Sequence, residues 1–117
     1  MISLVVDDDP SIRTYIASVL RRENFETLEA EGGRKAFEIV QRLGGKVDLI
    51  VTDIQMPDGD GITFANSVRM LFPSIPILIV SGCIRPKAEF EFVEKPFSAA
   101  TMLNVVRRVF GAEAKSA

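Results

Sequence analysis

The 117-residue sequence contains no histidine and a single cysteine, Cys83. Without histidine, neither a Ser-His-Asp triad nor a Cys-His pair can form, so hydrolases that depend on these nucleophiles are excluded. A lone cysteine cannot close a disulfide within the chain, and a metal site built from cysteine and histidine is also excluded. Two common classes of enzyme and one class of metal protein are thereby removed from consideration.

The chain also lacks an excess of basic residues and any long apolar run. Its 14 Lys and Arg face 16 Asp and Glu, a formal charge of −2, which gives no reason to expect nucleic-acid binding. No basic segment precedes the apolar residues before Asp7, so we expect no signal peptide and no membrane span. With 47% hydrophobic and 26% charged residues, the composition is that of one folded cytoplasmic domain.

Short apolar runs alternate with segments of helical periodicity along the sequence. Five runs predict strands, at residues 2–6, 25–30, 47–52, 75–80 and 90–93. Helical spacing of apolar residues predicts four helices, at residues 10–22, after Gly33, after Gly61 and after Ser98. This alternation implies a parallel sheet with helices on both faces.

The polarity of each strand predicts its place in the sheet. Residues 2–6, 49–51 and 77–80 are nearly all apolar, as in strands covered on both faces. Residues 25–30 and 90–93 mix polar and apolar side chains and fit the edges. We therefore predict an α/β, doubly wound, five-stranded parallel sheet in the order 2-1-3-4-5. In such a sheet, ligands bind outside the carboxyl ends of strands one and three.

The connection between the fourth and fifth strands is unusually short, residues 81–89 with Pro86 among them. Nine helical residues span about 14 Å, too short to return along a strand of roughly 17 Å, whereas nine extended residues reach about 30 Å. We therefore predict that the helix between strands four and five is missing or much shortened. Its loss leaves Ile84, Phe90 and Phe92 with less cover, so we expect an altered partner surface that could serve self-association.

Aspartates follow two neighbouring central strands of the predicted sheet. Asp7 and Asp8 follow strand one and Asp53 follows strand three, so all three side chains converge at one edge. Carboxylates this close repel one another unless a cation neutralises them, and oxygen ligands suit Mg²⁺. The alternative is that Asp7 and Asp8 only end the strand and cap the helix, which for Asp9, beside Pro10, is the favoured interpretation.

Ser81 ends strand four and Lys95 ends strand five, so both point toward the same edge as the aspartates. A hydroxyl and an ammonium beside a metal-bound carboxylate form a site suited to phosphoryl transfer. Taken singly, each residue could instead be a turn serine or a solvated lysine.

Four segments together resemble the response-regulator receiver domain of two-component signalling, the CheY-like family. They are Val5–Pro10, Asp53–Gly59, Val80–Gly82 and Glu94–Phe97. The resemblance covers residues 2–110, so we assign residues 1–112 to a receiver domain and 113–117 to a short polar tail.

The resemblance implies a phosphoacceptor at Asp53 and an Mg²⁺ site. The metal ligands would be Asp7, Asp8, Asp53 and the backbone carbonyl of Gln55. Lys95 would contact the phosphoryl group, and its bond to Pro96 would be cis.

The resemblance also implies a mechanism and a partner. A phosphohistidine of a sensor histidine kinase or phosphotransfer protein would give its phosphoryl group to Asp53, and the domain would catalyse its own phosphorylation and dephosphorylation. Ser81 would then move toward the phosphoryl group and Phe92 would occupy the vacated space. We further hypothesise that Gln55 and Cys83, each two residues beyond a site residue, tune hydrolysis by controlling the attacking water.

Two other functions fit parts of the sequence. One is a receiver-fold interaction module that is never phosphorylated, an alternative that the missing helix favours. The other is a haloacid-dehalogenase-like phosphatase, since Asp7-Asp8-Asp9 has the D-x-D spacing. That family also needs a late acidic pair, and no aspartate follows Asp60.

Overall fold

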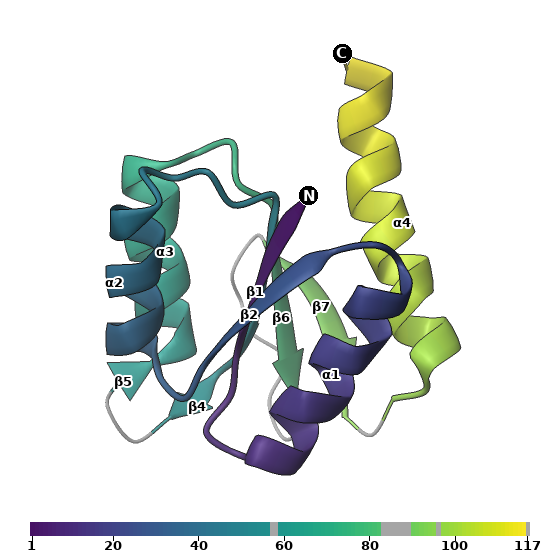
Figure 1. Cartoon of the computed structure of the whole chain (residues 1–117), viewed down its shortest axis with the longest axis horizontal. Coiled ribbons are helices and arrows are strands. Elements are labelled where there is room, and N and C mark those ends of the chain that lie inside the picture. The colour runs from purple at the N-terminus through teal and green to yellow at the C-terminus, as the bar shows by residue number, and fades with distance from the viewer. Residues whose placement is uncertain (57–58, 83–89, 96, 117) are drawn as a thin grey trace.

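The computed structural model describes residues 1–56, 59–82, 90–95 and 97–116 (Figure 1). Five strands form one parallel sheet: β1 (Ile2–Val6), β2 (Glu26–Ala30), β3 (Leu49–Asp53), β6 (Ile77–Ser81) and β7 (Glu91–Glu94). Their order is β2-β1-β3-β6-β7. Counted along the chain, these five strands have the predicted order 2-1-3-4-5, and each begins and ends within two residues of its predicted bounds.

Helices cover both faces of the sheet. The helices are α1 (Pro10–Arg22), α2 (Gly33–Arg42), α3 (Gly61–Leu71) and α4 (Ala99–Ser116). Helices α1 and α4 pack on one face and α2 and α3 on the other, so the molecule has three layers (Figure 1). Within the described residues, none of the helices combines the length and apolarity that crossing a membrane requires.

The central strands are buried on both faces, as their apolar sequences predict. In β1, Leu4 and Val6 pack toward α2 and α3, while Val5 between them packs toward α1 and α4. This follows from the alternation of side chains along a strand. At the edge, the hydroxyls of Ser3 and Thr27 form a buried hydrogen bond of 2.9 Å between β1 and β2. Each buried polar group in this pair thus has a partner.

The ends of the helices follow their sequences. Asp9 caps α1 and accepts a hydrogen bond from the Ser11 amide, with Pro10 in the first turn. Ser98 accepts a hydrogen bond from the Thr101 amide at the start of α4. Helix α4 continues to Ser116, through most of the segment that we assigned to a tail.

Two features of α3 and the chain before it differ from expectation. The two-residue strands β4 (Gln55–Met56) and β5 (Gly59–Asp60) form a small antiparallel pair that the sequence did not predict. Leu71 continues the helical spacing of apolar residues in α3, which predicts a buried position, but it is 55% exposed. The helix ends at this residue, and Phe72 packs against the core beyond it.

The connection from β6 to β7 consists of residues 82–90 alone, and the two strands pair in parallel. The described residues contain four helices, α1 to α4. The prediction that the helix between these two strands is missing or much shortened falls on residues outside them. Residues 83–89, including Cys83 and Ile84, lie outside the described residues.

The expected exposure of Phe90 is wrong. Its side chain is only 9% exposed because it packs into the core on the α2–α3 side of the sheet. The guanidinium carbon of Arg69, on α3, lies 4.0 Å from the centre of the Phe90 ring. Phe92 is half-buried against the same core. Helix α3 thus supplies cover that we expected to be lost, and self-association through this surface stays a prediction.

Candidate functional site

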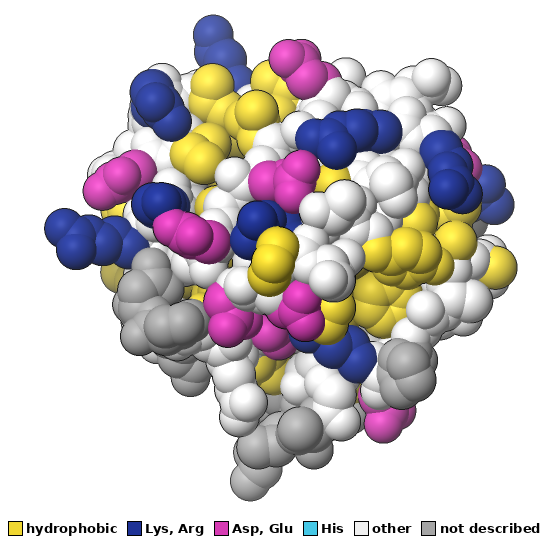
Figure 2. Space-filling view, turned by 60° about the horizontal axis from the view of Figure 1, so that its bottom comes forward, with side chains coloured by type: hydrophobic (Ala, Val, Ile, Leu, Met, Phe, Trp, Pro, Cys, Tyr) yellow, Lys and Arg dark blue, Asp and Glu magenta, His cyan; other side chains and the backbone are white. Residues whose placement is uncertain are grey.

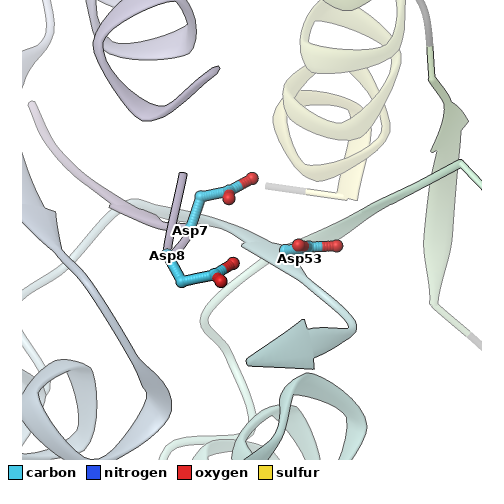
Figure 3. A group of neighbouring side chains, drawn as sticks. All are labelled: Asp7, Asp8 and Asp53. Atoms are coloured by element: carbon cyan, nitrogen blue, oxygen red, sulfur yellow. The ribbon is translucent and has the colours of Figure 1, made fainter. Parts of the chain in front are cut away.

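Asp7, Asp8 and Asp53 come together at the carboxyl end of the sheet, as the strand order predicts. Asp7 and Asp8 follow β1, Asp53 ends β3, and these strands are neighbours. One carboxylate oxygen of each residue lies within 4.8 Å of the others. Figure 3 shows the three side chains leaving the same edge of the sheet.

Asp7 is the most deeply buried of these aspartates, with 1% of its side chain exposed. Its Oδ1 accepts a hydrogen bond of 2.9 Å from the Asp9 amide, and its Oδ2 accepts one of 3.2 Å from the Lys95 ammonium. Burial raises the pKa of Asp7, and the nearby Asp53 carboxylate adds to this effect. The Asp9 amide and Lys95 lower the pKa without cancelling the rise.

Asp53 lies between a backbone amide and a cation. Its Oδ1 accepts a hydrogen bond of 2.8 Å from the Ile54 amide, and its Oδ2 lies 3.5 Å from the Lys95 ammonium. The side chain is 13% exposed, so part of it can be reached from solvent. The pairing of β7 with β6 positions Lys95, because the Lys95 amide extends the β6–β7 ladder by donating to the Ser81 carbonyl at 2.8 Å.

Gly61, the first residue of α3, lies directly against the backbone of Asp53. A Cβ atom at this position would lie 1.7 Å from the Asp53 carbonyl oxygen, a distance too short for any residue other than glycine to fit without a shift of the backbone. The Gly61 amide donates to the Ile54 carbonyl at 2.6 Å. The sequence suggested only that Gly61 breaks the chain before a helix, because its contact with Asp53 depends on how α3 returns to the sheet.

Two more of the predicted site residues, Ser81 and Gln55, lie close to the same edge. Ser81 is the last residue of β6 and is buried, one position beyond the Val80 that pairs with Asp53. Gln55 is exposed in β4, two residues beyond Asp53. Cys83 and the predicted cis bond at Pro96 fall outside the described residues.

The donor set at this edge fits a hard divalent cation. The three clustered carboxylates provide only oxygen ligands, and among the described residues a single ammonium, that of Lys95, pairs with them, so a cation relieves their repulsion. Oxygen ligands from one or two carboxylates, completed by water, are what Mg²⁺ takes in proteins.

An apolar hollow of about 460 Å³ adjoins Lys95. It is lined by three residues of α1 and two that follow β7: Ser11, Ile12, Tyr15, Lys95 and Phe97. The ring centres of Tyr15 and Phe97 are 6.0 Å apart. Figure 2, which brings this end of the molecule forward, shows apolar surface close to acidic and basic side chains.

The family described as response regulator receiver domain matches residues 3–107, most of the chain. The chain belongs to this family. Its relatives are receiver domains of response regulators and hybrid kinases, which are phosphoacceptor signalling domains of two-component systems. Receiver domains generally bind Mg²⁺ at an acidic pocket, and this chain has an aspartate cluster at the corresponding edge.

Individual receiver proteins match nearly all of the chain. It is 32% identical over 114 residues to the sensor kinase CckA of Brucella abortus, covering 91% of this chain but 12% of that protein. It is 29% identical over 113 residues to the transcriptional regulator NtrC of Bradyrhizobium, covering 90% of this chain and 23% of that protein. The chemotaxis protein CheY4 of Vibrio cholerae has a solved structure that superposes with a TM-score of 0.83 at 30% identity, covering 92% of this chain and 97% of that one. The chain therefore spans a minor part of these two curated relatives and nearly all of the chemotaxis protein.

Proposed function

We propose that Asp53 accepts a phosphoryl group from the phosphohistidine of a sensor histidine kinase or phosphotransfer protein in the cytoplasm. The observation that carries this proposal is the position of Asp53, partly exposed to solvent and beside both the Lys95 ammonium and the Asp7–Asp8 pair. A carboxylate held between a cation and further metal-ligand side chains can act as a nucleophile toward phosphorus.

In the proposed reaction, an Asp53 carboxylate oxygen forms a bond to phosphorus while the bond from phosphorus to the imidazole nitrogen breaks. The imidazole nitrogen keeps the electron pair and leaves with its partner protein. Lys95 offsets negative charge on the transferring oxygens, and the Ser81 hydroxyl donates to one of them. Dephosphorylation is attack of water on the same phosphorus, which releases phosphate and restores Asp53.

Asp7, Asp8, Asp53 and the Gln55 carbonyl would hold Mg²⁺ in this site. Bound Mg²⁺ supplies positive charge beside the acceptor and the phosphoryl oxygens. Asp7 must be ionised to act as a ligand, and its contacts with the Asp9 amide and Lys95 favour that state against the effect of burial.

The donor protein must dock close to the sheet edge where Asp53 is exposed. The hollow lined by Ile12, Tyr15 and Phe97 provides apolar contact area next to Lys95. Apolar patches beside a polar centre are typical of protein-interaction surfaces.

After phosphorylation, we propose that Ser81 moves toward the phosphoryl group and that Phe92 shifts in response. Phe92 pairs across the strands with Ile79, two residues before Ser81, and is only half-buried, which leaves room for a second side-chain position. Gln55 and Cys83 are proposed to tune hydrolysis through the attacking water.

The test is phosphorylation by acetyl phosphate, with and without Mg²⁺, followed by intact mass. Wild type should gain one phosphoryl group only with Mg²⁺, and Asp53→Asn should gain none. Asp9→Asn is the matched control, since asparagine keeps the helix cap while removing a neighbouring carboxylate. No gain in wild type under any condition would contradict the proposal and favour an interaction module that is never phosphorylated.

A further inference from the structure

The peptide between Asp7 and Asp8 is contacted by a charged side chain that the proposed chemistry does not use. Arg13 lies in the first part of α1, and its Nη1 donates to the backbone carbonyl of Asp7 at 2.9 Å. The Arg13 side chain is only 20% exposed, so this charged hydrogen bond is partly shielded from water.

That carbonyl belongs to the peptide joining the two aspartates, whose side chains are drawn in Figure 3. Because a peptide is planar, its orientation sets the ψ angle of Asp7 and the φ angle of Asp8 together. The Asp7 amide, on the other side of the residue, donates to the Ala30 carbonyl at 3.1 Å. Holding both backbone groups of Asp7 therefore fixes the directions in which the Asp7 and Asp8 side chains leave the backbone.

Glu29, on β2, orients the Arg13 guanidinium. Arg13 Nε donates to Glu29 Oε1 at 3.2 Å, while Arg21 Nη2 donates to the other oxygen, Oε2, at 3.3 Å. The guanidinium is planar with fixed N–H directions, so two bonds to different partners leave it a single orientation. Arg21 contacts Glu29 too, but its backbone partner is the Thr27 carbonyl, 3.0 Å away on β2.

We propose that Arg13, supported by Glu29, is a positioning residue for the acidic pair. Arg13 does not touch the reacting atoms and acts through the Asp7–Asp8 peptide. The inference rests on the proposed function, in which these two aspartates hold Mg²⁺. Contacts that orient ligand residues typically change metal affinity by about 10- to 100-fold.

Arg21 provides a matched control. It lies on the same helix, pairs with the same glutamate and donates to a strand carbonyl, but it does not contact the Asp7 peptide. Replacing either arginine removes one ion pair and one hydrogen bond, so both changes should lower stability to a similar degree. Only the Arg13 change should alter the geometry of the Asp7–Asp8 pair.

The experiment compares wild type, Arg13→Met and Arg21→Met by calorimetric Mg²⁺ titration. Amide exchange at Asp9 is measured in the Mg²⁺-free proteins, because this amide donates to Asp7 Oδ1. We expect Arg13→Met to weaken Mg²⁺ binding about tenfold and to speed exchange at Asp9. Arg21→Met should leave both within about twofold of wild type.

Unchanged Mg²⁺ affinity and unchanged Asp9 exchange in Arg13→Met would overturn the inference, as would equal changes in the two variants. If Arg13→Met does not fold, Arg13→Lys and Arg21→Lys replace the pair, and the larger loss is expected at Arg13, with equality overturning the inference. A wild type that binds no Mg²⁺ contradicts the proposed function instead, and Asp9 exchange then decides the positioning role by itself.

Discussion

The two halves of the site are held in place by different means. In the acceptor half, at the ends of β1 and β3, backbone amides one or two residues away hold the carboxylates: Ile54 on Asp53 and Asp9 on Asp7. In the other half, at the ends of β6 and β7, Lys95 reaches a carboxylate 88 residues distant in sequence. Local backbone geometry therefore shapes the acceptor half, whereas the position of the lysine depends on the whole sheet.

The steric fit also differs between the halves. At Gly61, behind Asp53, a Cβ atom would lie 1.7 Å from backbone, while at Gly82, after β6, it would lie 3.5 Å from the Lys95 Cβ, an ordinary contact. The acceptor half should thus respond to small changes in shape, and the lysine half to changes in charge. Four substitutions, three of them paired with a control variant, probe this difference and the sheet edge beside it.

The largest effect is expected from Gly61→Ala, with Gly82→Ala as its counterpart in the other half. Because the backbone of α3 or of Asp53 must move, we expect Gly61→Ala to cost about 3 kcal/mol of stability. Gly82→Ala should change stability by less than about 0.5 kcal/mol. Urea unfolding measures both, and equal losses would contradict the steric difference.

Lys95→Met should slow phosphorylation by acetyl phosphate about 100-fold, because the charge on the transferring oxygens loses its cation. The same change should tighten Mg²⁺ binding, since the Lys95 ammonium lies 3.2 and 3.5 Å from two of the candidate ligand carboxylates and competes with the metal. Lys46→Met, an exposed lysine outside the site, is the charge control. Weaker Mg²⁺ binding with an unchanged rate would be evidence against this role.

Asp7→Asn should stabilise the Mg²⁺-free protein at neutral pH. Burial raises the pKa of Asp7 above the ordinary 3.8, so the folded state binds this proton more tightly than the unfolded chain. The stability that this proton contributes is complete at pH values below the pKa of Asp7 in the unfolded chain. It is lost as the pH rises through the pKa of Asp7 in the folded protein. The advantage of the variant should therefore shrink as pH falls toward 3.8.

Urea midpoints across this pH range, for wild type and Asp7→Asn, check the prediction. Mg²⁺ should raise the stability of wild type and have much less effect on the variant. A variant that is less stable than wild type at neutral pH would show that the contacts of Asp7 outweigh its burial.

The smallest effect is expected from Arg69→Gln, which removes the cation over the Phe90 ring. We expect a loss of about 0.5 to 1 kcal/mol of stability and an unchanged rate of phosphorylation. Arg108→Gln breaks the exposed ion pair with Glu91 on β7 and should change stability by less than about 0.5 kcal/mol. An altered phosphorylation rate in Arg69→Gln would instead place Phe90 in the response to phosphorylation.

Most of the fold could be predicted because its determinants are local. The apolar run at residues 2–6 and the cap at Asp9 lie within the elements that they specify. The β4–β5 pair could not be predicted, since two-residue strands have no periodicity to detect. Nor could the burial of Phe90, which packs into the core and against Arg69 on α3.

The candidate site also has parts that could be predicted from the sequence and parts that could not. That Asp7, Asp8 and Asp53 converge follows from strand order alone, and the structure confirms it. The contact of Arg13 with the Asp7 carbonyl could not be predicted, because helical spacing gives the face of a residue but not the backbone atom that its side chain reaches. The roles of Gln55 and Cys83 stay predictions.

The most direct test of the central proposal is to locate the phosphoryl group. Borohydride reduces an aspartyl phosphate to homoserine, so treating the phosphorylated protein and sequencing its peptides by mass spectrometry identifies the acceptor. The account predicts homoserine at position 53 and at neither Asp7 nor Asp8. Homoserine at either of those two residues, or none at all in protein that has gained the mass of a phosphoryl group, would contradict it.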